Sequence, residues 1–135
     1  MNPAVRSALE EIFRRLDAEI AAMGASCAAC GDCCRFKESG LVLMASRVEV
    51  ERLLATSGPP PHPWDGNACP YLADDVCTAR EGRVLGCRIY FCAPRMKPLM
   101  PGLYEKYLRD LKSLHDRLGI PWEYVRVMEA LEESV

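Results

Sequence analysis

Apolar residues near the start of the chain recur at intervals of three and four positions, with charged residues between them. They are Val5, Leu9, Ile12, Phe13, Leu16, Ile20 and Met23. This spacing gathers apolar side chains on one face of a helix, and a glycine such as Gly24 commonly follows a helix end. The pattern therefore predicts an amphipathic N-terminal helix within residues 1–24.

Two further apolar stripes occupy residues 101–135. The first stops at Gly119 and contains Tyr104, Tyr107, Leu108, Leu111, Leu114 and Leu118. Pro121 is then expected to open a second helix, because proline is well accepted at the first helical position. The inward face of that helix would be Trp122, Val125, Met128, Ala130 and Leu131. We expect these residues to form a C-terminal helical hairpin.

The middle of the chain, residues 25–95, is rich in glycine, proline and short turns. Its one clear helix follows Ser46, which forms a capping-box pair with Glu49. Residues 41–44 are compatible with a short strand, and the proline-rich residues 58–64 indicate an extended loop. The sequence thus predicts a mainly α, small single domain over residues 1–135, with little sheet and an irregular, metal-centred middle between terminal helices.

Composition narrows the functional classes. A chain of 135 residues has the size of one domain, and its net charge of −2 provides no basic field for nucleic acid. The first 24 residues carry acids and bases throughout, so they match neither a secretory signal nor a membrane span. We therefore expect a cytoplasmic protein with no nucleic-acid or membrane partner.

Cysteine is the most informative residue type. The eight cysteines are Cys27, Cys30, Cys33, Cys34, Cys69, Cys77, Cys87 and Cys92. Stable disulfides are uncommon in a reducing compartment, so this density favours a metal or cluster over a redox switch or inert buried thiols. Two residues between cysteines in a turn bring the sulfurs close enough to bind one zinc ion or neighbouring irons. All eight cysteines are candidate metal ligands.

Arginines accompany the later cysteines. Arg83 and Arg88 are candidate cofactor-binding residues, because a guanidinium near a thiolate centre would offset its negative charge. The alternative is that these arginines are solvated or pair with Asp74, Asp75 or Glu81.

The order of these motifs resembles the YkgJ-like cysteine-cluster family, which is described as zinc- or iron-chelating. The matching residues are Cys27, Cys30, Cys33, Cys34, Cys69, Pro70, Leu72, Cys77, Cys87, Arg88, Tyr90 and Cys92. Arg83 is similar to the arginine of the family's Arg-Pro pair, although Val84 stands where proline is usual. The resemblance covers the middle half of the chain and implies a metal- or cluster-binding domain.

Two functions remain open. The first is an iron-sulfur protein, with a 4Fe-4S cluster favoured, that transfers or senses electrons; its three-cysteine run and Cys69-Pro70 are similar to ferredoxin motifs. The second is a structural zinc module that serves as a scaffold for a protein partner. A protein partner is expected in either case.

Enzymatic activity is uncertain, and no catalytic residue can be assigned. An enzyme would need a spare reactive thiolate such as Cys34 or Cys92. His62 is interpreted as a solvated loop residue and His115 as part of a polar helix face, so neither is a predicted ligand. We also expect metal binding to be coupled to folding, because much of the middle segment has few apolar residues.

Overall fold

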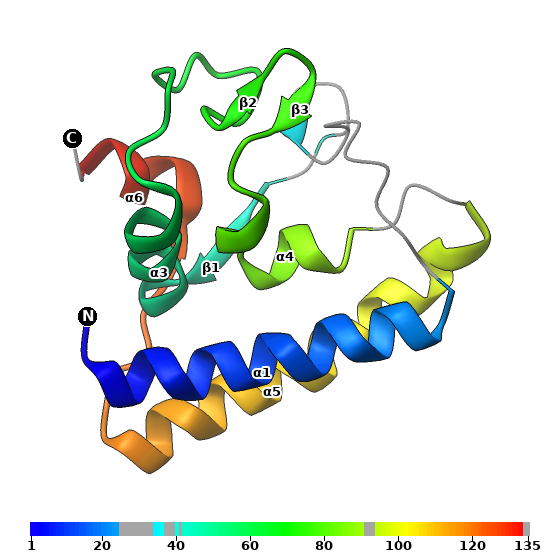
Figure 1. The fold of residues 1–135 in the computed structure, drawn as a ribbon, viewed down its shortest axis with the longest axis vertical. Helices are drawn as coiled ribbons and strands as arrows, with labels where there is room; N and C mark the ends of the chain where they lie inside the picture. The colour runs from blue at the N-terminus through cyan, green and yellow to red at the C-terminus, as the bar shows by residue number, and fades with distance from the viewer. Residues whose placement is uncertain (25–33, 37–39, 41, 91–93, 134–135) are drawn as a thin grey trace.

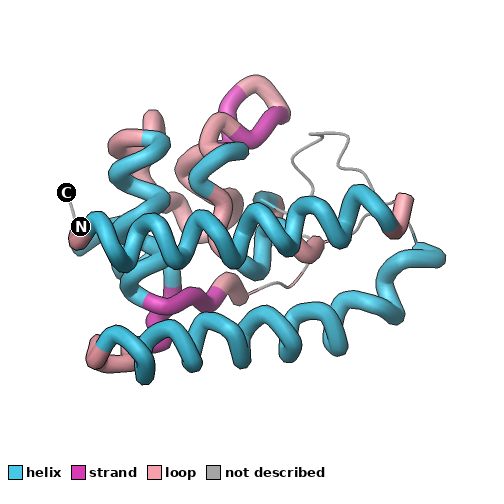
Figure 2. The backbone as a smooth tube through the Cα atoms, turned by 60° about the horizontal axis from the view of Figure 1, so that its bottom comes forward, coloured by secondary structure: helices cyan, strands magenta, loops and turns pink. Residues whose placement is uncertain are grey.

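Two long helices lie side by side along one edge of the molecule and run in opposite directions (Figures 1 and 2). They are α1 (Pro3–Ala22) and α5 (Met100–Leu118). The structure is a computed structural model that describes residues 1–24, 34–36, 40, 42–90 and 94–133. The domain is small, single and mainly α, as predicted.

Capping residues fix the ends of the two long helices, and the predicted glycine stop at Gly119 is confirmed. The Asn2 side chain accepts a hydrogen bond from the Ala4 N–H at 2.8 Å, which satisfies one free donor at the start of α1. α5 ends at Gly119, whose φ of +67° lies in the left-handed region that glycine adopts without strain.

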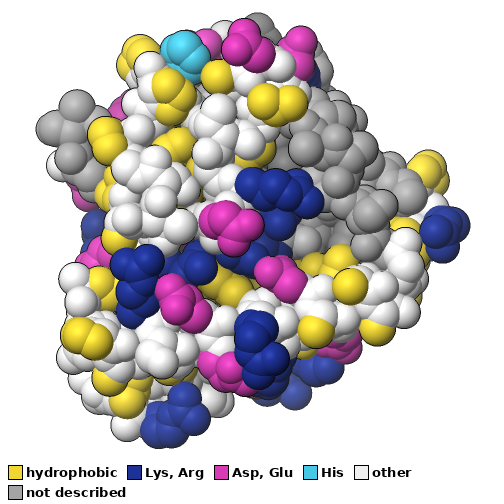
Figure 3. Space-filling view, in the orientation of Figure 1, with side chains coloured by type: hydrophobic (Ala, Val, Ile, Leu, Met, Phe, Trp, Pro, Cys, Tyr) yellow, Lys and Arg dark blue, Asp and Glu magenta, His cyan; other side chains and the backbone are white. Residues whose placement is uncertain are grey.

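The apolar faces of α1 and α5 form a first core. It contains Val5, Leu9, Ile12, Phe13 and Leu16 from α1, and Leu103, Tyr107, Leu111 and Leu114 from α5. The N-terminal stripe predicted from the sequence is therefore the buried face. On the opposite, exposed side, acidic and basic side chains are interspersed, as Figure 3 shows for the face that α1 covers.

A second core lies above the helix pair and is built largely by the middle segment. Its buried residues include Phe36, Leu43, Val50, Leu53, Tyr71 and Val84, together with Val127, Met128 and Leu131 near the C-terminal end. The described part of the middle segment therefore contributes buried apolar residues to a core that it shares with the C-terminal end, and the coupling of its folding to a metal stays a prediction.

Helix α3 (Arg47–Ser57) has the predicted capping box. The Glu49 N–H donates to Ser46 Oγ, and the Ser46 N–H donates to Glu49 Oε2 at 2.8 Å. The chain then passes through the 3-10 helix η2 (Arg80–Gly82), α4 (Leu85–Arg88) and the 3-10 helix η3 (Pro94–Leu99).

The expected C-terminal helical hairpin is wrong in one respect. Pro121 does not open a helix; instead β4 (Tyr124–Arg126) pairs antiparallel with β1 (Met44–Ser46). The last helix, α6 (Val127–Glu133), begins after this strand and packs in the second core, whereas α5 packs in the first. The expected short strand also begins later than residues 41–44, at Met44.

A short hairpin joins β2 (Leu72–Ala73) to β3 (Val76–Cys77). Its two central residues, Asp74 and Asp75, have φ values of +50° and +63°. Positive φ at both central positions matches the twist of a two-residue hairpin, and aspartate tolerates it better than most residues. With the pair β1 and β4, this hairpin makes up the sheet found in the described residues, which is as little as predicted.

No helix in the described part of the chain is both long enough and apolar enough to span a bilayer.

Candidate metal centre

Four of the eight predicted ligands fall within the described residues: Cys34, Cys69, Cys77 and Cys87. Cys27, Cys30, Cys33 and Cys92 lie outside them. No disulfide joins the four described cysteines to one another. The geometry of the candidate centre can therefore be built from these four thiols and the elements that carry them.

A backbone hydrogen bond joins the two cysteine groups that are far apart in the sequence. The Cys69 N–H donates to the Cys34 carbonyl at 2.7 Å. The Cys69 carbonyl then accepts from the Leu72 N–H at 2.9 Å, closing a turn around the buried Pro70. The chain that follows the first cysteine run is thus fixed directly against the Cys69-Pro70 turn.

The β2–β3 hairpin brings a third cysteine to the same place. Leu72, three positions after Cys69, is paired with Cys77 across the hairpin. The hairpin therefore brings Cys77 back toward the Cys69 turn. The Arg35 guanidinium, directly after Cys34, donates to Asp75 Oδ1 in the hairpin turn at 2.7 Å. The Asp75 side chain is exposed to solvent, so this ion pair contributes little to stability.

The thiols of Cys34 and Cys77 interact directly. A hydrogen bond from the Cys34 thiol lowers the pKa of Cys77 to about 6, helped by the Ala79 N–H and by the charges of Arg83 and Arg80, and opposed by burial. Cys77 is therefore largely a thiolate at neutral pH, and the thiolate is the form of cysteine that binds metals.

Tyr71 lies beside this group. Its hydroxyl donates to the Gly58 carbonyl at 2.7 Å, and burial together with the nearby Cys69 raises its pKa to about 12. The ring is 2% exposed and forms part of the second core. Tyr71 therefore connects the cysteine turn to the start of the proline-rich loop, a role that the sequence pattern alone did not reveal.

Cys87 lies on α4, where its N–H donates to the Val84 carbonyl at 3.1 Å. Its side chain, like those of Cys69 and Cys77, packs against the second core. Cys34 is itself only 3% exposed. Such burial argues against the expected alternative that Cys34 is a reactive thiol open to a substrate; Cys92 lies outside the described residues.

Arg83 and Arg88 differ in what they contact. The charge of Arg83 acts on Cys77, in line with its predicted electrostatic role. The Arg88 guanidinium donates to the carbonyls of Glu81 and Arg83, at 2.7 and 2.8 Å, and to Asp17 on α1. Arg88 therefore holds the segment that carries Arg83; direct contact of Arg88 with a thiolate-bound centre stays a prediction.

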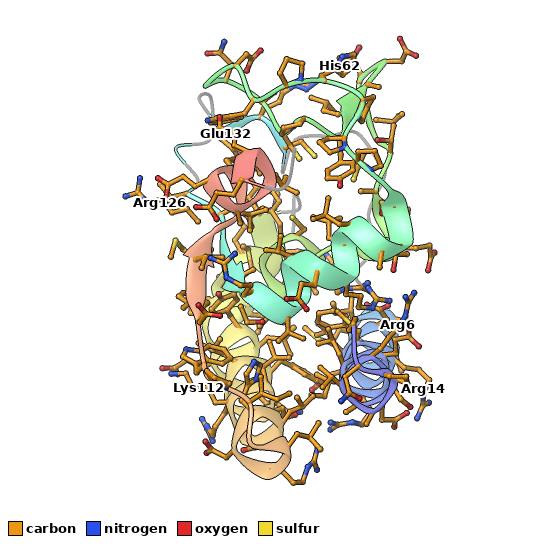
Figure 4. All side chains as sticks on the ribbon, turned by 90° about the vertical axis from the view of Figure 1, so that its left-hand side faces the viewer. Arg6, Arg14, His62, Lys112, Arg126 and Glu132 are labelled. Atoms are coloured by element: carbon orange, nitrogen blue, oxygen red, sulfur yellow. The ribbon has the colours of Figure 1, made fainter. Side chains whose placement is uncertain are left out.

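The two histidines are separate from this group. His115 is 2% exposed and its Nδ1–H donates to the Leu111 carbonyl at 2.8 Å, so its assignment to a polar helix face was wrong. His62 borders an open cavity formed by the proline-rich loop, Trp64 and α6. Figure 4 shows His62 near the end of the molecule that lies far from Lys112.

Among the described residues, no group of three or more histidine, cysteine or acidic side chains is arranged to hold a metal ion. The donor set nevertheless fits one in its chemistry, since two thiols are in contact and one has a lowered pKa. No family model, curated protein or solved structure matches the chain.

Proposed function

We propose that the cysteines of the middle segment bind a metal centre as thiolates, and that this centre is an iron-sulfur cluster used for electron transfer or redox sensing. The observation that supports the proposal is that Cys34 contacts two cysteines that are distant from it in the sequence. Cys34 is bonded through its backbone to Cys69 and through its thiol to Cys77. Burial alone raises the pKa of an inert core thiol, whereas the pKa of Cys77 is lowered.

The ligand set is proposed as follows. Cys34, Cys69 and Cys77 would contribute from the described group, and Cys87 from α4. The remaining predicted ligands are Cys27, Cys30, Cys33 and Cys92. An iron-sulfur cluster bound here would supply one-electron chemistry at a potential set by charge and hydrogen bonds around the sulfurs.

The surrounding residues have definable tasks. The guanidinium groups of Arg80 and Arg83 offset the negative charge of the thiolates. The Ala79 N–H donates toward the Cys77 sulfur and stabilises it as an anion. Cys34 is only 3% exposed, so water has little access to it.

A structural zinc site is the second candidate. It is favoured by the burial of Cys34, because structural zinc sites are closed to solvent. In this case the protein would act as a scaffold that presents its helices to a partner protein.

Anaerobic purification followed by elemental analysis for iron, zinc and sulfide separates these candidates. The proposal expects iron and sulfide in similar amounts and a broad visible absorption. A colourless protein with stoichiometric zinc would replace the iron-sulfur assignment by the zinc one. A protein that retains neither metal, even after reconstitution, would end both.

Matched variants tie the metal to the described cysteines. Cys69→Ser is expected to lose most of the bound metal, whereas Ala68→Ser at the neighbouring position retains it, because only the first removes a thiolate donor. Equal metal content in the two variants would remove Cys69 from the ligand set.

A further inference from the structure

An apolar groove of about 310 Å³ lies between the β1–β4 pair, α4 and the start of α5. Its lining includes Val42, Met44, Tyr90, Tyr104 and Tyr124. Among the described residues that line it, none is charged. A groove of this size and composition suits an apolar group with few polar contacts.

The edges of this groove expose apolar surface to water. Val42 is 61% exposed and Tyr124 is 37% exposed, and Leu99, next to the lining residue Met100, is 47% exposed. Single exposed apolar residues are common, but a cluster around one groove is typical of an interaction site.

Basic side chains flank the groove. Lys97 Nζ lies 5.9 Å from the ring centre of Tyr90, and Lys112 Nζ lies 5.6 Å from that of Trp122. The Trp122 ring stacks on Tyr124, with the ring centres 5.8 Å apart. Cations placed over aromatic rings at the border of an apolar surface favour a partner that carries negative charge.

Arg126 adds a third positive charge on β4, directly across from Met44. Its nearest carboxylate oxygen, on Glu129, is 3.9 Å away and both side chains are exposed, so this pair is weak. Figure 4 shows Arg126, at the end of β4, and Lys112 on the same side of the molecule. Arg126 and Lys112 therefore place two positive charges on the side of the molecule that carries β4.

The outer edge of β4 provides backbone groups for an extended segment. The hydrogen bonds from the Arg47 N–H to the Glu123 carbonyl and from the Val127 N–H to the Leu43 carbonyl set the register of β1 and β4. In this antiparallel register, the backbone groups of Tyr124 and Arg126 point away from β1. Within the described residues β4 has no strand partner besides β1, and an unpaired strand edge can pair with a partner strand.

We propose that this groove binds an extended acidic segment of a partner protein, which lays an apolar side chain against Tyr90 and against Tyr104 and Tyr124, whose hydroxyls are hydrogen-bonded to each other. The apolar lining receives the anchor side chain, the lysines and Arg126 attract the acidic residues beside it, and the edge of β4 fixes the backbone. This inference goes beyond metal binding and does not depend on which metal is bound.

Fluorescence polarisation with a labelled peptide tests the proposal on the full chain. The peptide has a central Phe flanked on both sides by Gly and Glu residues. We expect saturable binding that weakens about tenfold or more for Tyr124→Ala, because large aromatic residues dominate such interfaces. Val42→Ser, which changes an exposed side chain and leaves the folded core intact, is expected to weaken binding in the same direction.

Control variants distinguish binding in the groove from binding elsewhere on the protein surface. Lys112→Glu should weaken binding, whereas Arg14→Glu should not, because Arg14 lies on the opposite side of the molecule in Figure 4. Leu118→Ser is the matched apolar control, since Leu118 is 40% exposed and does not line the groove. A peptide with Ser in place of Phe should bind weakly.

Several results would overturn the proposal. One is equal binding of a peptide in which Lys replaces Glu. Another is an affinity that none of the groove variants changes. Concentration-dependent dimerisation that Val42→Ser abolishes would assign the groove to a second copy of this chain instead of an acidic partner.

Discussion

Arg88 Nη1 donates a hydrogen bond to Asp17 Oδ2 at 2.8 Å, although 71 positions separate the two residues in the sequence. The guanidinium also lies over the Phe13 ring, 4.3 Å from its centre, and its side chain is 4% exposed. This contact fixes the segment between Cys77 and Cys87 to α1. It links the candidate metal centre to the helix pair.

Replacing Arg88 should therefore destabilise the fold. Arg88→Ala removes a donor from the Arg83 carbonyl and one of the two donors of the Glu81 carbonyl, which Arg52 also contacts. It also removes the buried partner of Asp17, and we expect a loss of about 3 kcal/mol in the free energy of unfolding. Asp17→Asn should cost only about 1 kcal/mol, because the Asp17 side chain is half exposed. Urea denaturation of the metal-free protein measures both values.

Arg14→Ala is the control, since the Arg14–Glu11 pair is exposed on both sides. It should change stability by less than about 0.5 kcal/mol. If Arg88→Ala were no more destabilising than this control, the anchoring role of Arg88 would be wrong.

Sequence spacing identified the local half of this architecture. The stripe in α1, the glycine stop of α5 and the Ser46–Glu49 capping box all depend on residues within a few positions of one another, and all are confirmed. His115 could also have been placed correctly, because it lies four positions after Leu111 and so on the same helix face.

Contacts between residues that are far apart in the sequence could not be predicted from spacing. Val125, Met128 and Leu131 have helical spacing, yet Val125 lies in a three-residue strand whose partner is Ala45. Such a short strand leaves no period of its own to detect. Likewise, the position of Arg88 next to Cys87 suggested a thiolate partner, because nothing in the sequence links it to Asp17.

Glu49 illustrates a second distant contact with a pH consequence. Its Oε1 accepts from the Leu85 N–H at 2.8 Å, which caps the start of α4 as well as α3. The side chain is 1% exposed, and burial raises the pKa of Glu49 above its usual 4.5, although hydrogen bonds from Leu85 and Ser46 oppose the shift.

The raised pKa predicts a pH-dependent stability difference between the wild type and Glu49→Gln. A carboxyl whose folded-state pKa is raised contributes most below the unfolded pKa, and this contribution falls as the pH rises through the folded pKa. Glutamine does not ionise. The stability of the wild type relative to the variant should therefore fall as the pH rises above about 4.5.

Urea denaturation of both proteins from acidic to neutral pH checks this sign. A difference that stays constant, or that grows in favour of the wild type with rising pH, would show that the pKa of Glu49 is not raised. Glu51→Gln, at an exposed position on the same helix, controls for the loss of one negative charge.

Cys77 should be an unusually reactive thiol in the metal-free, reduced protein. Because the pKa of Cys77 is about 6, its alkylation by iodoacetamide should reach half its maximal rate near that pH, well below the usual value of 9.0. Mass spectrometry of the peptide that contains Cys77 measures the rate directly.

Two variants test the cause of this shift. Cys34→Ala removes the main hydrogen bond to the Cys77 sulfur and should move the midpoint upward more than Arg83→Gln, which removes only a nearby charge. A larger effect of Arg83→Gln would reverse that order and assign the shift to electrostatics.

Metal removal should affect the two cores unequally. The first core joins α1 to α5 without any of the described cysteines, whereas Cys69, Cys77 and Cys87 pack against the second. If the thiolates bind a metal, chelation removes binding free energy mainly from the second core, since a ligand that binds only the folded state stabilises it. We expect a lower thermal midpoint, with residual helix from the α1–α5 pair.

Hydrogen exchange before and after chelation measures this effect for each segment. Faster exchange at Leu72 and Val84, with unchanged protection at Leu9 and Leu111, supports the proposal. An unchanged thermal transition contradicts it.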